Sequence, residues 1–139
     1  MAEKAEKVIL TTGKRKLAVA RASIKKGSGK VTINGFPLEL WSPEYTRLRI
    51  REPLIIAGDM AGKVDIKVSV DGGGKAGQSD AVRQAIAKAM LEFYNDEKLK
   101  NAYIEFDRSL LAFDPRRTEP HKPSRSRKGA RRHKQRSKR

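Results

Sequence analysis

The clearest pattern along the chain is a strict alternation of apolar and polar side chains from Val64 to Val70. Alternation with a period of two predicts a β-strand with one buried face. The next periodic segment, Ser79 to Tyr94, predicts an amphipathic helix with Ser79 as its N-cap and with Arg83 and Lys88 on its outer side. Its apolar positions recur at helical spacing and are Val82, Ala85, Ile86, Ala89, Met90 and Phe93.

Shorter patterns near the N-terminus predict two strands. The first runs from Val8 to Thr12 and is expected to end in a basic turn at residues 13–16, where a glycine is followed by three cations. The second runs from Leu17 to Lys25. Its even positions form one face of small or apolar side chains, namely Ala18, Ala20, Ala22 and Ile24.

The second strand is followed by a flexible Gly-Ser-Gly segment at residues 27–29. This segment predicts a hairpin that joins the second strand to a third one at Lys30–Asn34. Asn34-Gly35 is a favoured hairpin turn and is expected to close that third strand.

A helix is expected to begin at Ser42, because serine is a good N-cap and because Pro43 and Glu44 suit the first turn. Trp41, Tyr45 and Leu48 are expected to mark its apolar side. Pro53 should end or kink this helix, and Gly58 should stop the short helical piece that follows.

The last elements before the C-terminal region are a helical turn at residues 96–100, a strand at Ala102–Phe106 and an apolar anchor at residues 110–113. Together these patterns predict an α+β fold. We expect a two-layer βα sandwich in residues 1–113, with a sheet of four or five strands and two or three helices. A body of this length is enough for one compact domain.

Residues 114–139 are different in kind. They contain twelve Lys or Arg against two acids and a single apolar side chain, Ala130, so they carry +10 of the total charge of +16. Such a segment cannot bury enough apolar surface to offset its ordering entropy, and we expect it to be a disordered tail that orders on a polyanion. Fully extended, it could reach about 85 Å. Nucleic acid is the expected partner.

The composition argues against several other classes of protein. The chain has no cysteine, and both of its histidines, His121 and His133, lie in the tail. No catalytic or metal-binding constellation is visible, so neither an enzyme nor a bound cofactor is expected. No apolar window is long enough to span a membrane, and residues 1–7 do not resemble a signal peptide.

A glycine loop at residues 72–79 separates the clearest strand from the clearest helix and matches the dinucleotide pattern G-x-G-x-x-G. It also approaches a phosphate-binding P-loop, but Gln78 stands where that loop needs lysine. A dinucleotide fold needs two mononucleotide halves, and only one is visible. Two interpretations stay open: the loop seats a nucleic-acid phosphate beside Lys75, or it lets the helix pack closely on the sheet.

Three basic clusters lie in the body, at residues 14–16 with Arg21, at residues 25–30, and at Arg47, Arg49 and Arg51. Asp107 and Asp114 are expected to neutralise nearby arginines. No recognition helix or aromatic stacking platform is evident, so a large folded RNA is a better match than sequence-specific reading of duplex DNA.

Three segments, in order, resemble the signatures of the universal small-subunit ribosomal protein nine family. They are residues 12–22, the glycine loop with residues 81–89, and the ending Ser137-Lys138-Arg139. Residues 42–58 look like the archaeal and eukaryotic branch, and the cysteine-free, charge-rich composition leans towards archaea. The alternative function is a free-standing basic chaperone or compaction protein for nucleic acid.

The resemblance implies a structural protein in the head of the small ribosomal subunit, in the cytoplasm, beside neighbouring ribosomal proteins. It also implies that the tail runs through ribosomal RNA to the transfer RNA at the peptidyl site. The residues implied in transfer-RNA binding are Ser137, Lys138 and Arg139. Those implied in ribosomal-RNA binding are Lys14, Arg15, Lys16, Arg21, Gly72, Gly73, Gly74, Lys75, Gln78, Arg83, Arg116, Arg117, Lys122, Arg125, Arg127, Lys128, Arg131, Arg132, Lys134 and Arg136.

Overall fold

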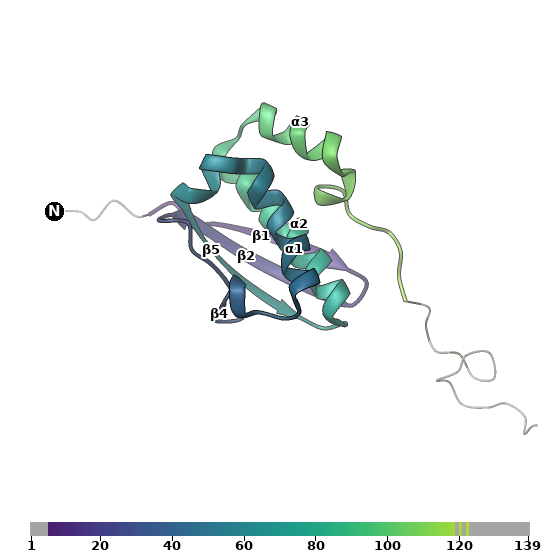
Figure 1. Ribbon diagram of the computed structural model, residues 1–139. Helices are drawn as coiled ribbons and strands as arrows, with labels where there is room; N and C mark the ends of the chain where they lie inside the picture. Colours follow the sequence, from purple (N-terminus) through teal and green to yellow (C-terminus); the bar gives the residue numbers. More distant parts are fainter. Residues whose placement is uncertain (1–5, 119, 121, 123–139) are drawn as a thin grey trace, which may run out of the picture.

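A computed structural model describes residues 6–118, 120 and 122. In this part of the chain, one mixed sheet is combined with three α-helices (Figure 1). The strands are β1 (Ile9–Arg15), β2 (Ala18–Lys26), β3 (Val31–Ile33), β4 (Phe36–Pro37) and β5 (Val64–Asp71). The helices are α1 (Glu44–Ala57), α2 (Lys75–Tyr94) and α3 (Glu97–Phe106), with short 3₁₀ turns η1 (Leu38–Leu40), η2 (Gly58–Lys63) and η3 (Arg108–Leu110).

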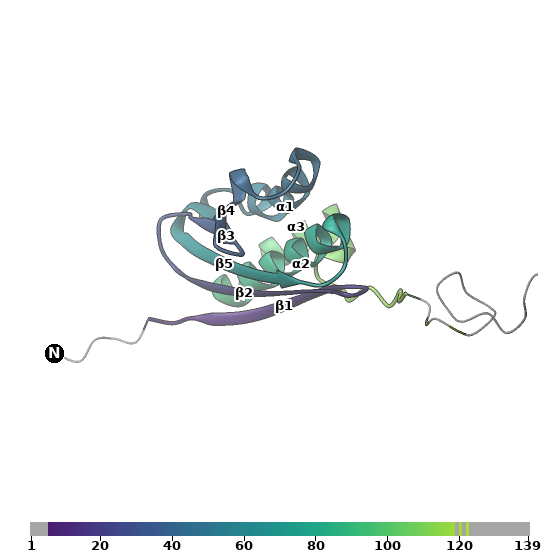
Figure 2. The same ribbon diagram turned by 90° about the horizontal axis from the view of Figure 1, so that it is seen from below.

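The sheet has the strand order β1-β2-β5-β3-β4, and the helices lie on one side of it (Figure 2). Burial follows from this arrangement: Val64, Ile66, Val68 and Val70 of β5 are buried, whereas the residues between them are exposed or half-buried. A sheet covered on one face only shows this alternation. The two-layer α+β prediction is therefore confirmed for the body.

The core is built from small residues at the contact of α2 with β1 and β2. Ala81, Ala85 and Ala89 of α2 are fully buried, as is the alanine face of β2. A Cβ atom on Gly13 would lie 2.1 Å from the carbonyl oxygen of Ala81. Because Gly13 has no side chain, β1 passes directly beneath α2 and continues to Arg15. The predicted basic turn at residues 13–16 was wrong in this respect, since the chain turns only at residues 16–17.

The predicted hairpin between the second and third strands was also wrong. β2 pairs antiparallel with β5, and β3 pairs parallel with the other edge of β5. The Gly-Ser-Gly segment instead crosses the end of β5, where the Asp65 carboxylate accepts hydrogen bonds from the backbone N–H groups of Ser28 (2.8 Å) and Lys30 (3.0 Å). These two bonds lower the pKa of Asp65. The Asn34-Gly35 turn is confirmed, because both residues have positive φ (52° and 83°) between β3 and β4.

Helix α1 differs from the expectation in three ways. Ser42 adopts a positive φ (62°) and caps nothing, since the helix begins at Glu44 after Pro43. Pro53 lies inside the helix, where its burial offsets the lost backbone hydrogen bond and its carbonyl accepts a bond from the Tyr103 hydroxyl (2.9 Å). The predicted apolar side was wrong for two of its three residues, Tyr45 and Leu48, which are exposed. The end at Gly58 is confirmed.

The C-terminal helices also depart from the prediction. α2 begins at Lys75, four residues before Ser79, and the Ser79 hydroxyl donates to the carbonyl of Ala76 instead of capping the helix. The expected turn and strand over residues 96–106 are one helix, α3. Leu99 and Tyr103 are one turn apart and both buried, and this helical pair outweighs the strand-like alternation at its end.

The apolar anchor predicted at residues 110–113 is confirmed at Leu110, which is fully buried, and was wrong for Phe113, which is 47% exposed. None of the described helices has the length and apolar character needed to cross a membrane.

Candidate nucleic-acid interface

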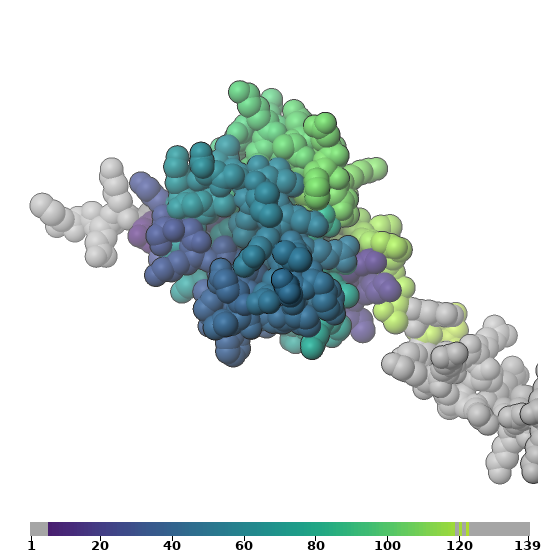
Figure 3. Space-filling model, in the orientation of Figure 1, coloured from purple at the N-terminus to yellow at the C-terminus, as the bar shows by residue number. Residues whose placement is uncertain are grey.

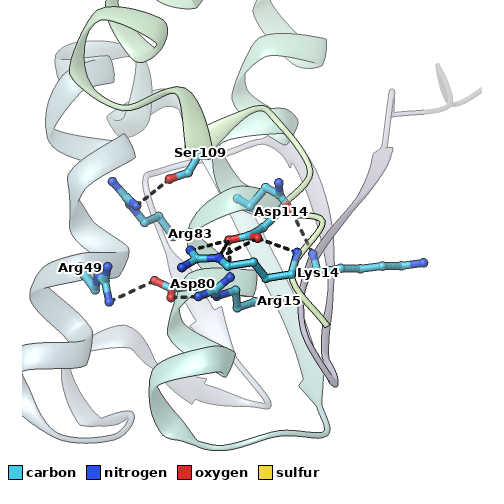
Figure 4. Close-up of a pocket in the computed structure, with 9 residues that line it drawn as sticks. Lys14, Arg15, Arg49, Asp80, Arg83, Ser109 and Asp114 are labelled. Atoms are coloured by element: carbon cyan, nitrogen blue, oxygen red, sulfur yellow. Dashed lines mark hydrogen bonds and ion pairs between the residues drawn. The ribbon is translucent and has the colours of Figure 1, made fainter. Parts of the chain in front are cut away.

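A hollow lies where the tail leaves the body, between the end of β1, the N-terminal halves of α1 and α2, and the segment after η3 (Figure 4). We call it the basin. It brings together five cations and two carboxylates from four separate stretches of sequence. Its lining residues are Lys14, Arg15, Arg49, Asp80, Arg83, Gln84, Ser109, Asp114 and Arg116.

Charges alternate across the basin. Asp80 lies between Arg49 (3.3 Å) and Arg15 (3.8 Å). Arg15 also pairs with Asp114, and Asp114 pairs in turn with Arg116 (2.8 Å). Hydrogen bonds from the Arg116 side chain and backbone are the main reason that the pKa of Asp114 is held far below its usual range. Each guanidinium is thus held in place by a carboxylate of the chain itself.

Arg83 forms the inner wall of the basin. Only 7% of its side chain is exposed, so the prediction that it lies on the outer side of its helix was wrong. Its Nη2 atom lies 2.6 Å from Glu52 and 3.0 Å from Asp107. Burial of Asp107 works against ionisation, but hydrogen bonds from Ser109 and Arg83 outweigh it and lower the pKa of Asp107. This confirms that Asp107 neutralises an arginine.

The first residues of the tail are attached to the body. The Gln84 side chain fixes the segment just before the tail to β1: its Nε2 donates to the carbonyl of Ala112 (2.7 Å), and its Oε1 accepts from the backbone N–H of Lys14 (2.9 Å). The guanidinium of Arg117 stacks 5.0 Å from the ring centre of Phe113. The tail therefore starts from a fixed position at the edge of the basin.

The glycine loop lies beside the turn between β1 and β2. Gly72 and Gly73 have positive φ (76° and 67°), and a Cβ on Gly72 would lie 2.4 Å from the carbonyl oxygen of Leu17. Gln78 donates to the carbonyl of Gly72 (3.1 Å). These contacts support the close-packing interpretation of the loop. The phosphate-seat interpretation stays a prediction, with Lys75 exposed at the first turn of α2.

Residues 13–139 match the family model described as "Ribosomal protein S9/S16". The chain is 50% identical over 131 residues to the small ribosomal subunit protein uS9 of Methanococcus vannielii, a match covering 94% of this chain and 98% of that protein. The chain belongs to the ribosomal protein S9/S16 family. The uS9 protein of Pyrobaculum aerophilum is 52% identical over 117 residues, which are 84% of this chain and 82% of that protein.

Membership of the S9/S16 family makes the chain a structural constituent of the small ribosomal subunit, in the cytoplasm, and not an enzyme. The resemblance noted in the sequence is thereby confirmed, including its archaeal character, since both relatives named are archaeal. Ribosomal RNA and ribosomal proteins are the partners implied for such a constituent. The free-standing chaperone is set aside as the weaker alternative.

The residues predicted to bind RNA in this S9/S16 family member lie in several places in the structure. Lys14, Arg15, Arg83 and Arg116 meet in the basin. Lys16, Arg117 and the glycine loop lie next to it, with Arg117 donating to the carbonyl of Lys16 (3.4 Å). Arg21 is exposed on the uncovered face of the sheet, beside Ser69 and Asp71. Lys122 is exposed, and residues 125–139 lie outside the described part of the chain.

The sequence interpretation missed Asp80 and Glu52. No residue near either acid in the sequence indicates its role, because their ion-pair partners are distant in the chain. Asp80 pairs with Arg15 and Arg49, and Glu52 pairs with Arg83. Arg49 was noted as one of three cations at alternate positions, but nothing in that spacing shows which of them lines the basin.

Proposed function

We propose that the chain binds ribosomal RNA in the head of the small subunit through the basin and the tail, and that the end of the tail contacts transfer RNA at the peptidyl site. The observation that carries this proposal is the position of the basin. It places five cations and two carboxylates at the point where residues 114–139, which carry a net charge of +10, begin.

The basin offers phosphate groups two kinds of arginine. Arg49 and Arg116 are open to solvent, with 49% and 71% of their side chains exposed, so they can donate outward to phosphate. Arg15 and Arg83 are largely enclosed and hold the inner wall. Carboxylates already orient these arginines, so little side-chain entropy is lost on binding. Contacts of this kind fix the position of the protein on RNA without reading bases.

Residues 1–113 act in this proposal as a globular domain, and residues 114–139 as a tail that orders on RNA. The tail cations neutralise closely spaced phosphates and release counterions. Its last three residues, Ser137, Lys138 and Arg139, are assigned to the transfer-RNA backbone on family resemblance.

Salt titration tests the basin. Arg49→Gln and Arg116→Gln should each weaken binding of the full chain to head-domain ribosomal RNA, and should each reduce the slope of log affinity against log salt by about 1. The matched control is Lys100→Gln, an exposed cation on α3 outside the basin. Equal slopes for all three variants and the unchanged chain would contradict the role of the basin.

A second experiment separates the two parts of the tail. Removing residues 137–139 takes away only two of its twelve cations, so subunit assembly should proceed while transfer-RNA affinity at the peptidyl site falls. Removing residues 114–139 should impair assembly itself. Unchanged transfer-RNA affinity in filter binding to subunits with the shorter deletion would overturn the terminal assignment.

A further inference from the structure

The side of the sheet that faces away from the helices is not covered by any other described element (Figure 2). Figure 3 shows the opposite side of the body, where the helices and the segment before α1 form most of the surface and β1 and β2, in purple, appear only at the margins. We call the uncovered side the open face. It consists of the residues that alternate with the buried positions of β1, β2 and β5, together with Thr32, which pairs with Lys67. The alternating residues are Leu10, Thr12, Lys14, Val19, Arg21, Ser23, Lys25, Asp65, Lys67, Ser69 and Asp71.

Strand register aligns these residues in rows that run across the sheet. Arg21 and Lys67 lie in adjacent central rows and are diagonal neighbours, about 7–8 Å apart. Hydroxyl groups make up most of the remaining side chains of these rows, with one apolar side chain, Leu10, on the edge strand and no carboxylate. The two central rows are Thr12, Arg21 and Ser69, and Leu10, Ser23, Lys67 and Thr32.

The other charges of the open face lie in its two end rows. Lys14 and Asp71 lie in the row nearest the basin. Lys25 and Asp65 are paired in the row at the other end of the strands, where Lys25 also lies 3.6 Å from Glu6. The acidic residues therefore lie at the ends of the face, and the cations at its centre have no acid beside them in the sheet.

The carboxylates of the open face already have partners in the chain, whereas its central cations do not. Asp65 accepts two backbone hydrogen bonds from the loop after β2, and Asp71 accepts one from the N–H of Gly72 (2.9 Å). Arg21 and Lys67 are exposed, and neither forms an ion pair with another described residue. The positive charge that lacks a partner is thus at the centre of the face.

These features favour RNA over protein as the occupant. Leu10 is the only exposed apolar side chain of the central rows, whereas the core of a protein interface is apolar and depleted of charge. The described strands place no aromatic residue on the open face, so it has no platform on which unpaired bases could stack. Cations and hydroxyls match the phosphates and 2′-hydroxyls that double-helical RNA presents.

We propose that the open face binds a double-helical segment of RNA through its backbone. Arg21 and Lys67 bind phosphates, and Thr12 and Ser69 form hydrogen bonds with ribose 2′-hydroxyls and phosphate oxygens. The face adjoins the basin, because Lys14 belongs to both and the hollow around Arg21 extends to the glycine loop. The inference rests on the proposed function, which supplies ribosomal RNA as the partner, and deepens it by assigning base-paired RNA to this side of the body.

Photocrosslinking in assembled subunits tests the identity of the occupant. A diazirine side chain placed at position 23 or 69 of the full chain should crosslink, on irradiation, to nucleotides on both strands of a paired segment of ribosomal RNA. The same group at position 104, an exposed position of α3 on the helix side of the body, should not crosslink to that segment. Crosslinks from 23 and 69 to a protein, to unpaired nucleotides only or to nothing would each overturn the proposal.

Charge removal gives an independent measure. The double variant Arg21→Gln, Lys67→Gln of the full chain should reduce the slope of log affinity for head-domain ribosomal RNA against log salt by about 2, since each phosphate contact contributes about 0.9. The matched control Lys98→Gln, Lys100→Gln removes the same charge from exposed positions of α3 and should leave the slope unchanged.

The basin variants distinguish failure of this inference from failure of the proposed function. An unchanged slope for the Arg21 and Lys67 variant, while Arg49→Gln and Arg116→Gln still reduce it, would contradict the open-face site and leave the proposed function standing. An unchanged slope for all of these variants would overturn both.

Discussion

The basin and the outer face of α1, formed by Tyr45, Leu48 and Ile55, are both exposed, but their side chains are held in opposite ways. In the basin, Asp80 and Asp114 fix the guanidinium groups beside them. On α1, Leu48 and Ile55 extend into solvent. Long charged side chains lose rotamer entropy when they bind a partner, and intramolecular ion pairs that already limit their rotamers reduce this loss. Short aliphatic side chains on a helix need no such support, because the helix itself fixes where they point.

The same comparison explains where the scaffold is rigid. The basin depends on the contact of β1 with α2, since β1 supplies Lys14 and Arg15 and α2 supplies Asp80, Arg83 and Gln84. The outer face of α1 depends on one helix alone. Damage to the β1–α2 contact should therefore disturb the basin and leave the α1 face intact.

The largest effect is expected from Gly13→Ala. The added Cβ would meet the carbonyl oxygen of Ala81 at 2.1 Å and the backbone nitrogen of Ala85 at 2.7 Å, and neither backbone can move alone. We expect the free energy of unfolding to fall by about 3 kcal/mol in chemical denaturation. Gly62→Ala is the control, because no atom lies within 4 Å of its added Cβ. Equal losses for the two variants would show that β1 does not depend on this close approach.

Arg83→Met should come next. It removes the shared cation of Glu52 and Asp107 and leaves two carboxylates facing each other inside the body. Because 30% and 39% of these side chains are exposed, water can partly solvate them, and we expect a loss of about 2 kcal/mol rather than the larger cost of a fully buried pair. Removing the carboxylates as well, by Glu52→Gln and Asp107→Asn, should restore part of the loss. A triple variant less stable than Arg83→Met would contradict this account.

These two sites show what the sequence can and cannot predict. The alternation in β5 and the periodicity of α2 identify core faces, because burial imposes their periods directly. The parallel pairing of β3 with β5 escaped prediction, because it depends on the order of strands in the sheet. α3 was misassigned because its last turn alternates like a strand. The cations of the basin were recognisable as charges, but their carboxylate partners come from distant segments.

The third effect concerns acid stability. Asp107 and Asp114 have lowered pKa values in the folded chain, so their contribution to stability is complete above their unfolded pKa, about 4, and is lost as the pH falls through the folded values. We expect the free energy of unfolding to decline below about pH 4. Asp114→Asn and Asp107→Asn should each flatten this decline. Glu105→Gln, an exposed carboxylate outside the ion pairs of the described residues, should leave it unchanged. A decline of equal steepness in all three variants would show that these pairs do not carry the acid sensitivity.

The smallest effect on the isolated chain is expected from the pair Leu48→Ser and Ile55→Ser. Both side chains already face water, so the free energy of unfolding should change by no more than about 0.5 kcal/mol per site. Ile50→Ala on the buried side of the same helix should cost about 3 kcal/mol. A large loss from the outer pair would show that these side chains contribute to the stability of the fold.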